Sequence, residues 1–419
     1  MDKILIRGGA ALKGTIPISG AKNATLPELA ATLLTSEKVY LTNIPHLADV
    51  TTMLELLGQQ GSDLTIDEKL GVEIDNRGIN NFCAPYDLVS TMRASILVMG
   101  PMLARYGQAE ISMPGGCAIG SRPVNLHIQG LRAMGAEVSL GDGYIRAKAK
   151  RLRGAKIFLE PVTVTGTENL LMAATLADGV TILENAAREP EVVDLANMLT
   201  SMGAKIQGAG SSTITIEGVD ELHGTKHNII PDRIETATFI IAAAITDGDI
   251  TLTNTQSEYL TVPIEAFRQA GIDIDLKDDG TMRIRKGSKL KALDIQTSPY
   301  PGFPTDIQAQ MLVLNSVSKG ISTVTETIFE NRFMHVSELQ RMGADITIQG
   351  NTVRVRGVKN LIGAPVMATD LRASASLVLA GLAANGDTLI SRVYHLDRGY
   401  ERIEEKLLAL GADIQRLSE

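Results

Sequence analysis

The sequence contains no tryptophan, and aromatic residues make up only 4% of its 419 residues. Its two cysteines, Cys83 and Cys117, are too few for a disulfide framework, so we expect a reducing compartment. No apolar run reaches the ~18 residues needed to span a bilayer. The N-terminus alternates after Met1-Asp2-Lys3 and lacks the layout of a signal peptide. These absences predict a soluble, cytoplasmic protein that does not insert into membranes.

Positive charge is also in deficit. The chain has 40 Lys and Arg against 48 Asp and Glu, a net charge of −8. Because nucleic-acid binding needs a basic footprint, no nucleic acid is expected as a partner. Hydrophobic residues make up 44% and charged residues 21%, a globular composition that excludes bulk disorder. A local basic site for a small anion is still compatible with this balance.

The chain does contain a sixfold internal repeat. In each unit a helix end is followed by glycine and then by an alternating strand, as in Met202-Gly203-Ala204-Lys205-Ile206. Glycine suits the left-handed position that ends a helix. Spacings of 74, 68, 68, 72 and 68 residues separate the repeated glycines, which are Gly61, Gly135, Gly203, Gly271, Gly343 and Gly411. Six units of about 70 residues therefore fill the chain.

A second signature lies halfway through each unit, a turn followed by a short strand such as Gly179-Val180-Thr181-Ile182-Leu183. It follows a helix that is apolar on nearly every face, such as Ala237–Ile245 or Ser374–Ala383, and such helices are buried. The other helix, such as Asp194–Met202, is predicted to be amphipathic with a charged outer face. The outer units match the inner ones, which favours closed lobes over a tandem solenoid. We therefore predict an α/β fold of two lobes with three units each.

Two segments between the units are candidate hinges, near residues 21–23 and 229–232. The lobes they predict are residues 22–230, which carry Cys117, and residues 1–21 plus 231–419. The alternating first 20 residues are expected to pair with the second lobe, so that the chain crosses between the lobes twice.

Positions where the sequence departs from the repeat are candidates for binding or catalytic residues. They gather at the start of the buried helix and in the loop before the exposed helix. Helix N-termini attract anions, and arginine binds phosphate or carboxylate through two parallel N–H bonds. If both lobes present these ends to one cleft, their cations form a basic pocket for a phosphate or carboxylate. The alternative is that each cation pairs with an acidic surface neighbour. The basic residues at such positions are Lys22, Arg93, Arg122, Arg372 and Arg398.

Cys117 lies in a glycine-rich insertion that the other repeats lack, Met113-Pro114-Gly115-Gly116-Cys117-Ala118-Ile119-Gly120-Ser121-Arg122-Pro123. Such a loop is typical of a mobile lid. Arg122 would favour the thiolate of Cys117, which could then act as a nucleophile or acid. The alternative is a small buried apolar cysteine, the interpretation that we prefer for Cys83.

Asp306 follows Phe303-Pro304-Thr305 and therefore opens a helix. Two roles stay open for it: an N-cap of that helix, or an acceptor of the proton of a substrate hydroxyl.

Metal and nucleotide cofactors are not expected. His223 and His227 are four residues apart, but Gly224-Thr225-Lys226 between them is typical of a loop, and no other ligands accompany them. The sequence has no P-loop, no GxGxxG after a strand and no paired CxxC.

Six segments together carry a resemblance to a known family. They are Ile18-Ser19-Gly20-Ala21-Lys22-Asn23-Ala24, Pro114 to Pro123, Phe303 to Asp306, Phe329-Glu330-Asn331-Arg332-Phe333, Asp370-Leu371-Arg372 and Asp397-Arg398-Gly399-Tyr400. The chain resembles, over its full length, the UDP-N-acetylglucosamine 1-carboxyvinyltransferases of the enolpyruvyl transferase family. This resemblance implies two inside-out α/β lobes, each with three copies of a βαβαββ unit.

The resemblance also implies a reaction without a cofactor. The enolpyruvyl group of phosphoenolpyruvate passes to the 3-hydroxyl of UDP-N-acetylglucosamine and phosphate is released, the first committed step of peptidoglycan biosynthesis. Cys117 would protonate C3 of phosphoenolpyruvate and can form a 2-(S-cysteinyl)pyruvate adduct, while Asp306 would take the hydroxyl proton; Lys22 and Arg398 complete the catalytic set. Phosphoenolpyruvate would be held by Lys22, Asn23, Arg122, Asp370, Arg372 and Arg398. The binding site of the sugar nucleotide would be lined by Arg93, Arg122, Pro123, Val124, Asn125, Leu126, Val162, Thr163, Val164, Thr165, Asp306 and Ile328.

Two positions depart from the family pattern. Val162 stands where many members carry Lys, and Asn125 replaces a frequent Asp. Two alternatives remain: a 5-enolpyruvylshikimate-3-phosphate synthase, and an inactive paralogue that binds a UDP-sugar. The first would show Ser after Lys22 and no cysteine loop, and the second would be expected to lack catalytic residues that this chain has.

Overall fold

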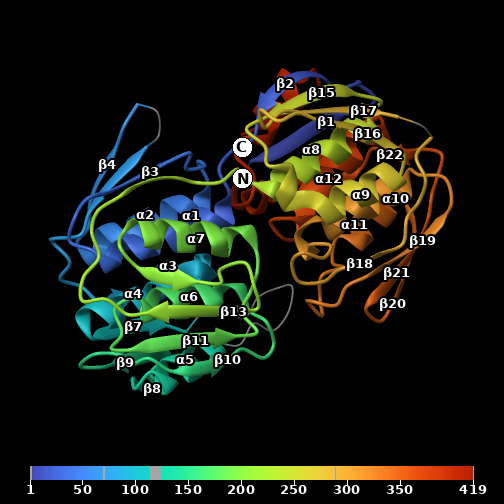
Figure 1. The fold of residues 1–419 in the computed structure, drawn as a ribbon. Coiled ribbons are helices and arrows are strands. Elements are labelled where there is room, and N and C mark those ends of the chain that lie inside the picture. Colours follow the sequence, from blue (N-terminus) through green and yellow to red (C-terminus); the bar gives the residue numbers. More distant parts are fainter. Residues whose placement is uncertain (1, 69–70, 114–123, 288, 419) are drawn as a thin grey trace. The chain divides into compact units, whose positions relative to one another are not determined.

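The computed structural model describes residues 2–68, 71–113, 124–287 and 289–418 (Figure 1). These residues form two compact units. The central unit comprises the described residues between 20 and 230, and the C-terminal unit comprises residues 2–19 together with the described residues from 231 onward. Each unit contains three four-stranded sheets around buried helices.

The three sheets of the central unit share one plan, in which one edge strand is parallel to its neighbour and the other pairs are antiparallel. In spatial order they are β14 (Lys226–Asn228), β3 (Val39–Thr42), β5 (Val72–Asp75) and β4 (Asp63–Ile66); β6 (Cys83–Ala84), β7 (Gln108–Ser112), β9 (Tyr144–Lys148) and β8 (Glu137–Gly141); and β10 (Lys156–Phe158), β11 (Val180–Glu184), β13 (Thr213–Glu217) and β12 (Lys205–Gln207).

The helices of the central unit divide by burial. Those buried on nearly every face are α1 (Lys22–Ala31), α4 (Met99–Tyr106) and α6 (Val164–Ala174), with 3₁₀ segments at Thr32–Leu34 and Arg93–Val98. The remaining helices are α2 (Ala48–Gln60), α3 (Tyr86–Thr91), α5 (Asn125–Ala133) and α7 (Pro190–Ser201).

Helix α7 corrects one expectation from the sequence. It begins at Pro190, four residues before the predicted start, and Pro at the first helical turn fits because its missing N–H is not needed there. The charged outer face that was predicted is wrong, since Glu191 and Asp194 are both buried. This helix therefore brings carboxylates into the interior of the central unit.

The C-terminal unit repeats the same sheet plan, again with one parallel pair at an edge. Its sheets are β16 (Ile272–Leu276), β17 (Met282–Lys286), β15 (Asp249–Thr253) and β2 (Lys13–Pro17); β18 (Ile295–Gln296), β19 (Ile321–Thr325), β21 (Thr352–Arg356) and β20 (Asp345–Gln349); and β23 (Pro365–Met367), β25 (Asp387–Ser391), β1 (Lys3–Arg7) and β26 (Asp413–Leu417). A two-stranded sheet joins β22 (Leu361–Ile362) to β24 (Ala384–Asn385).

Three buried helices form the centre of this unit and contact one another: α8 (Arg233–Ile245), α10 (Gln308–Ser316) and α12 (Ala373–Ala383) (Figure 1). They supply a continuous apolar core with the inward residues of the sheets. The other helices of this unit are only partly buried: α9 (Thr261–Gln269), α11 (Val336–Arg341) and α13 (Ile403–Ala409). None of the helices in the described parts of the chain is long and apolar enough to cross a membrane.

The six repeat glycines confirm the sixfold repeat. All have positive φ, between 86° and 106°, and each is followed within two residues by a strand. At Gly61 a side chain would also meet the carbonyl oxygen of Gly78 at 2.4 Å. Six matched sheets, three in each unit, exclude the solenoid alternative and confirm the predicted α/β architecture.

Candidate active site

Three of the predicted site residues, Cys117, Arg122 and Pro123, lie outside the described residues. The other candidates divide between the two units. Lys22, Asn23, Arg93, Val124 to Leu126 and Val162 to Thr165 belong to the central unit, and Asp306, Ile328, Asp370, Arg372 and Arg398 belong to the C-terminal unit.

In the C-terminal unit, Asp306 lies between two arginines. Its Oδ1 is 2.8 Å from Nη2 of Arg332, and its Oδ2 is 3.2 Å from Nε of Arg372. The Asp306 side chain is 24% exposed, whereas those of Arg332 and Arg372 are 5% and 2% exposed. The carboxylate is therefore reachable from solvent while both cations beside it are buried.

The position of Asp306 bears on one of its two predicted roles, the N-cap. It is the middle residue of a 3₁₀ turn, Thr305–Ile307, that leads into α10, and the N-cap positions of the turn and of the helix are held by Pro304 and Ile307. The N-cap interpretation is therefore wrong. The Asp306 carboxylate is 24% exposed, and its role as the acceptor of a hydroxyl proton stays a prediction.

The guanidinium of Arg372 has several partners besides Asp306. Its Nη1 donates to the carbonyl oxygen of Gly399 at 3.1 Å, its Nη2 is 3.8 Å from Oδ2 of Asp232, and its guanidinium lies 5.4 Å from the centre of the Tyr400 ring. Burial opposes its charge, but Asp232 and Asp306 outweigh burial and raise the pKa of Arg372 further above its usual range. The alternative that each cation pairs with an acidic neighbour therefore holds for Arg372, but its acidic neighbours lie in the interior and not on the surface.

Asp370 orders the start of α12. Its Oδ1 accepts hydrogen bonds from the backbone N–H groups of Arg372 at 2.8 Å and Ala373 at 2.9 Å. A carboxylate at the first turn of a helix also favours the positive end of the helix dipole. Asp370 thereby fixes the backbone that carries Arg372.

Glu326 connects the loop of Ile328 to the turn of Asp306. This buried carboxylate accepts hydrogen bonds from the hydroxyl of Thr305 at 2.7 Å and the backbone N–H of Ile328 at 2.8 Å. Arg332 donates to the same Thr305 hydroxyl at 2.8 Å. Glu326 and Arg332 were absent from the predicted site. Arg332 could have been found, because it stands in a loop that breaks the repeat, whereas Glu326 at the end of a strand gave no signal.

In the central unit, Lys22 forms a buried ion pair. Its Nζ is 2.6 Å from Oδ2 of Asp49, and the two side chains are 6% and 7% exposed. Lys22 is the first residue of α1, and Asp49 lies in the first turn of α2. A buried pair of this kind fixes geometry more surely than it adds stability. Asp49 was not anticipated from the sequence, since its partner is 27 residues away along the chain.

Asn169 on α6 holds three other elements of the central unit together. Its Oδ1 accepts from the backbone N–H of Gly100 at 2.7 Å, and its Nδ2 donates to the carbonyl oxygen of Ile96 at 3.1 Å. The same Nδ2 is 2.9 Å from Nδ1 of His127 on α5. Because the amide nitrogen is the donor, Nδ1 of His127 accepts and the ring proton lies on Nε2.

These elements carry the residues predicted for the sugar nucleotide. Arg93 opens the 3₁₀ segment that contains Ile96, α5 begins at Asn125 and α6 begins at Val164. Thr163 caps α6, its hydroxyl accepting from the N–H of Gly166 at 3.2 Å. The structure thus brings these three elements into contact within one unit. Arg93, Val124, Leu126, Val162, Thr163, Val164 and Thr165 are half-buried there, and Asn125 is exposed.

Acidification is expected to destabilise the central unit through His127. Burial, aided by Arg93, lowers the pKa of His127 from 6.5 to about 4. The unfolded chain therefore binds a proton that the folded chain excludes, so stability is complete above pH 6.5, falls as the pH falls from 6.5 to 4, and changes little below pH 4. A shift of this size corresponds to about 3 kcal/mol at pH 4. Thermal unfolding of the wild type and His127→Gln between pH 7 and pH 4 measures it. An equal dependence on pH in both proteins would contradict the assignment.

The family is established by comparison with known proteins. A family model described as EPSP synthase (3-phosphoshikimate 1-carboxyvinyltransferase) matches residues 6–407. Two relatives, both called UDP-N-acetylglucosamine 1-carboxyvinyltransferase, are 72% identical over 418 residues (Magnetococcus marinus) and 60% identical over 417 residues (Halorhodospira halophila), with 100% of both chains covered in each case. The chain belongs to the UDP-N-acetylglucosamine 1-carboxyvinyltransferase family. The resemblance seen in the sequence is confirmed.

Solved structures agree on the fold. The enolpyruvyl transferase NikO from Streptomyces tendae superimposes with a TM-score of 0.90 at 25% identity, covering 100% of this chain and 99% of that one. An EPSP synthase from Acinetobacter baumannii superimposes with a TM-score of 0.79 at 19% identity, covering 100% of both chains. At 19% identity the second comparison shows the fold alone, so the alternative shikimate enzyme gains no support from it. The chain is a transferase of the enolpyruvyl transferase fold.

Proposed function

We propose that this chain transfers the enolpyruvyl group of phosphoenolpyruvate to the 3-hydroxyl of UDP-N-acetylglucosamine and releases phosphate. The observation that carries the proposal is 72% identity, over the whole length of both chains, to a protein named for UDP-N-acetylglucosamine 1-carboxyvinyl transfer. This reaction commits the sugar nucleotide to peptidoglycan biosynthesis. The inactive-paralogue alternative is disfavoured because Lys22, Cys117, Asp306 and Arg398 are all present.

The reaction is an addition followed by an elimination. The sugar oxygen bonds to C2 of phosphoenolpyruvate while C3 gains a proton, so the hydroxyl proton must be accepted and another proton delivered. The C2–phosphate bond then breaks as a proton leaves C3, which restores the double bond and frees phosphate. A positioned acid or base accelerates such a proton transfer by about 10²–10⁴-fold.

Asp306 is proposed to accept the hydroxyl proton. It is the partly exposed carboxylate of the arginine pair, and Arg332 and Arg372 hold its two oxygens in fixed positions. The carboxylate is 24% exposed, so a substrate hydroxyl can reach it from solvent. Arg332, Arg372 and Asp370 then act as positioning residues for Asp306.

The other site assignments remain proposals drawn from the family pattern. Cys117 donates the proton to C3 and can form the cysteinyl adduct. Phosphoenolpyruvate is bound by a set whose cations favour departure of the phosphate: Lys22, Asn23, Arg122, Asp370, Arg372 and Arg398. UDP-N-acetylglucosamine is bound by Arg93, Arg122 to Leu126, Val162 to Thr165, Asp306 and Ile328. Because Val162 is apolar, any contact it makes with the diphosphate comes from its backbone.

Phosphate release tests the proposal. The purified chain is expected to release phosphate only when both phosphoenolpyruvate and UDP-N-acetylglucosamine are present, and Cys117→Ala is expected to lose about 10²-fold or more of this rate. Shikimate 3-phosphate in place of the sugar nucleotide is expected to give no release. Release from phosphoenolpyruvate with shikimate 3-phosphate, but not with the sugar nucleotide, would instead identify a 5-enolpyruvylshikimate-3-phosphate synthase. No release with either acceptor would favour the inactive paralogue.

Alkylation by an epoxide phosphonate such as fosfomycin is expected at Cys117, with Cys83 spared. Cys83 is the matched internal control, because burial and the charge of Glu110 raise the pKa of its thiol and keep it protonated near neutral pH. Peptide mass spectrometry after alkylation locates the adduct. Labelling of Cys83 in preference to Cys117 would contradict the assigned nucleophile.

A further inference from the structure

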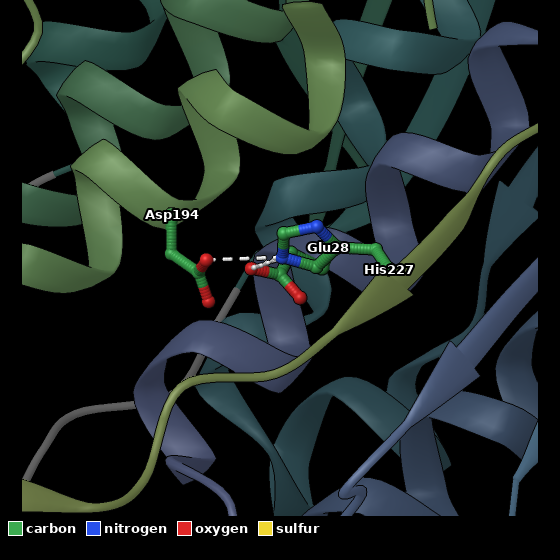
Figure 2. A group of neighbouring side chains, drawn as sticks. All are labelled: Glu28, Asp194 and His227. Carbon is green, nitrogen blue, oxygen red and sulfur yellow. Dashed lines mark hydrogen bonds and ion pairs between the residues drawn. The ribbon is translucent and has the colours of Figure 1, made fainter. Parts of the chain in front are cut away.

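Three side chains from distant parts of the central unit meet in its interior (Figure 2). Glu28 comes from α1, Asp194 from α7 and His227 from β14. Nε2 of His227 is 3.0 Å from Oδ1 of Asp194 and 3.5 Å from Oε1 of Glu28, and the three ligand atoms all lie within 4.8 Å of one another. The family pattern assigns no role to any of the three residues.

Glu28 is a buried carboxylate whose partner among the described residues is the imidazole of His227 at 3.5 Å, an ion pair when that ring is protonated. The Glu28 side chain is 0% exposed, yet neither of its oxygens has a hydrogen-bond partner among the described residues. A buried carboxylate without hydrogen bonds is strongly destabilising unless it is protonated or a cation compensates it. Figure 2 shows the carboxylate directed at the imidazole and at Asp194.

Further carboxyl groups lie close to the cluster. Glu168 on α6 is buried as well, and burial together with Glu191, Glu189 and Glu28 raises its pKa well above the usual range. Burial and the charge of Asp194 likewise raise the pKa of Glu28, against the opposing effect of His227. Helices α1, α6 and α7 therefore bring several carboxyl groups together in the interior, and a bound cation would stabilise their charged forms.

We propose that Glu28, Asp194 and His227 bind one divalent first-row transition-metal ion, of which Zn²⁺ is the probe. Zn²⁺ binds imidazole nitrogen at 2.0–2.1 Å and carboxylate oxygen at 2.0–2.2 Å, which places tetrahedral ligands roughly 3.4 Å apart. The separations of 3.0 and 3.5 Å bracket this value. Two carboxylates and one neutral imidazole balance a dication, and water supplies the fourth ligand.

The groups behind the ligands are already ordered. The backbone N–H of Ile230 donates to Oδ2 of Asp194 at 3.1 Å, which leaves Oδ1 facing the imidazole. His227 is held within the ladder that pairs β14 with β3, and its side chain is 14% exposed. Such ordering by outer groups is typical of functional metal sites.

The ion would join three elements that are distant in the sequence. It would link α1, whose first residue is Lys22, to α7 and to the strand that ends the central unit. The site therefore stabilises the helix that carries a proposed substrate residue, without touching the substrate itself. The sequence could not show this site, because only His223 and His227 are close along the chain, and His223 takes no part in the cluster.

Metal binding requires a proton to leave the site. In the metal-free protein the neighbouring carboxylates raise the pKa of His227 to about 10, against burial. Zn²⁺ must therefore displace the imidazole proton, and binding is measured at pH 8, where this competition is weaker than at neutral pH.

The experiment measures Zn²⁺ binding and thermal stability of the full chain after treatment with a chelator. We expect about one Zn²⁺ per chain after desalting, and a rise in melting temperature of about 5–10 °C at a hundredfold excess over the dissociation constant. Co²⁺ substituted at the site is expected to give visible absorption without a thiolate charge-transfer band, because no cysteine is a ligand. This readout separates the cluster from binding at Cys83 or Cys117.

Glu28→Gln and His227→Gln are expected to abolish the rise in melting temperature and the bound Zn²⁺, and His223→Gln is the matched control that keeps both. Glu28→Gln removes a buried charge without changing the side-chain shape, so it is expected to stay folded. Substoichiometric Zn²⁺ in the wild type, or equal binding in wild type and Glu28→Gln, would overturn the proposal and leave a proton as the only occupant of the cluster. None of these readouts depends on enolpyruvyl transfer.

Discussion

Replacing Asp306 with asparagine is expected to lower kcat by about 10²–10⁴-fold while KM for UDP-N-acetylglucosamine changes only a few-fold. Asparagine keeps the shape of the side chain and still accepts a hydrogen bond from a hydroxyl, but it takes no proton at neutral pH. The effect should therefore fall on the chemical step rather than on binding. Initial rates of phosphate release over a range of sugar nucleotide concentrations separate kcat from KM.

Asp345→Asn is the matched control for this experiment. Asp345 is an exposed carboxylate on β20 whose nearest described cation is Arg356 at 3.4 Å, also exposed, so its replacement should leave both constants unchanged. A rise in KM with unchanged kcat in Asp306→Asn would show that Asp306 only binds the sugar. Unchanged constants would remove it from the site.

Replacing Arg372 with methionine is expected to reduce the free energy of unfolding by about 3–5 kcal/mol. The substitution keeps much of the side-chain volume but leaves Asp232 and Asp306 without the cation between them. Breaking a buried ion pair from one side is destabilising because the remaining charge stays buried. Denaturant unfolding of both proteins measures the difference.

Arg356→Met provides the comparison for a cation on the surface. Arg356 is 59% exposed and pairs with Asp345 at 3.4 Å, so its loss is expected to cost at most about 1 kcal/mol. A loss below about 1 kcal/mol in Arg372→Met as well would show that the interior ion pairs contribute little. Arg372 would then not be the residue that holds Asp306 in place.

The repeat was predictable because it rests on local rules. Each repeat glycine ends a helix in the left-handed region, and each following strand alternates, so both features are visible in short windows of sequence. Apolar runs such as Ala237–Ile245 identified the central helices, because a helix without a polar face has to be buried. The alternating pattern of the first residues likewise predicted a strand that pairs with the second lobe, and β1 pairs with β25 and β26 although they are distant in the sequence.

The polar interior was not predictable by the same rules. Asp194 and Glu191 have the spacing predicted for an exposed face of α7, but both side chains are buried. Burial of Asp194 is possible because His227 of β14, which also contacts Glu28 of α1, pairs with it. Asp306 was singled out by its motif, yet its arginines lie 26 and 66 residues away along the chain. Ion pairs of this kind depend on the packing of whole elements, for which a single sequence gives no spacing rule.

The identity of the product tests the central claim most directly. With phosphoenolpyruvate and UDP-N-acetylglucosamine in D₂O, proton NMR is expected to show an enol ether on the 3-oxygen of the sugar, with deuterium entering its vinyl carbon, because C3 gains a proton and loses one again. Both substrates should disappear together with the appearance of phosphate. A sugar nucleotide that stays unmodified while phosphoenolpyruvate is consumed, or a product that carries no deuterium, would contradict the account.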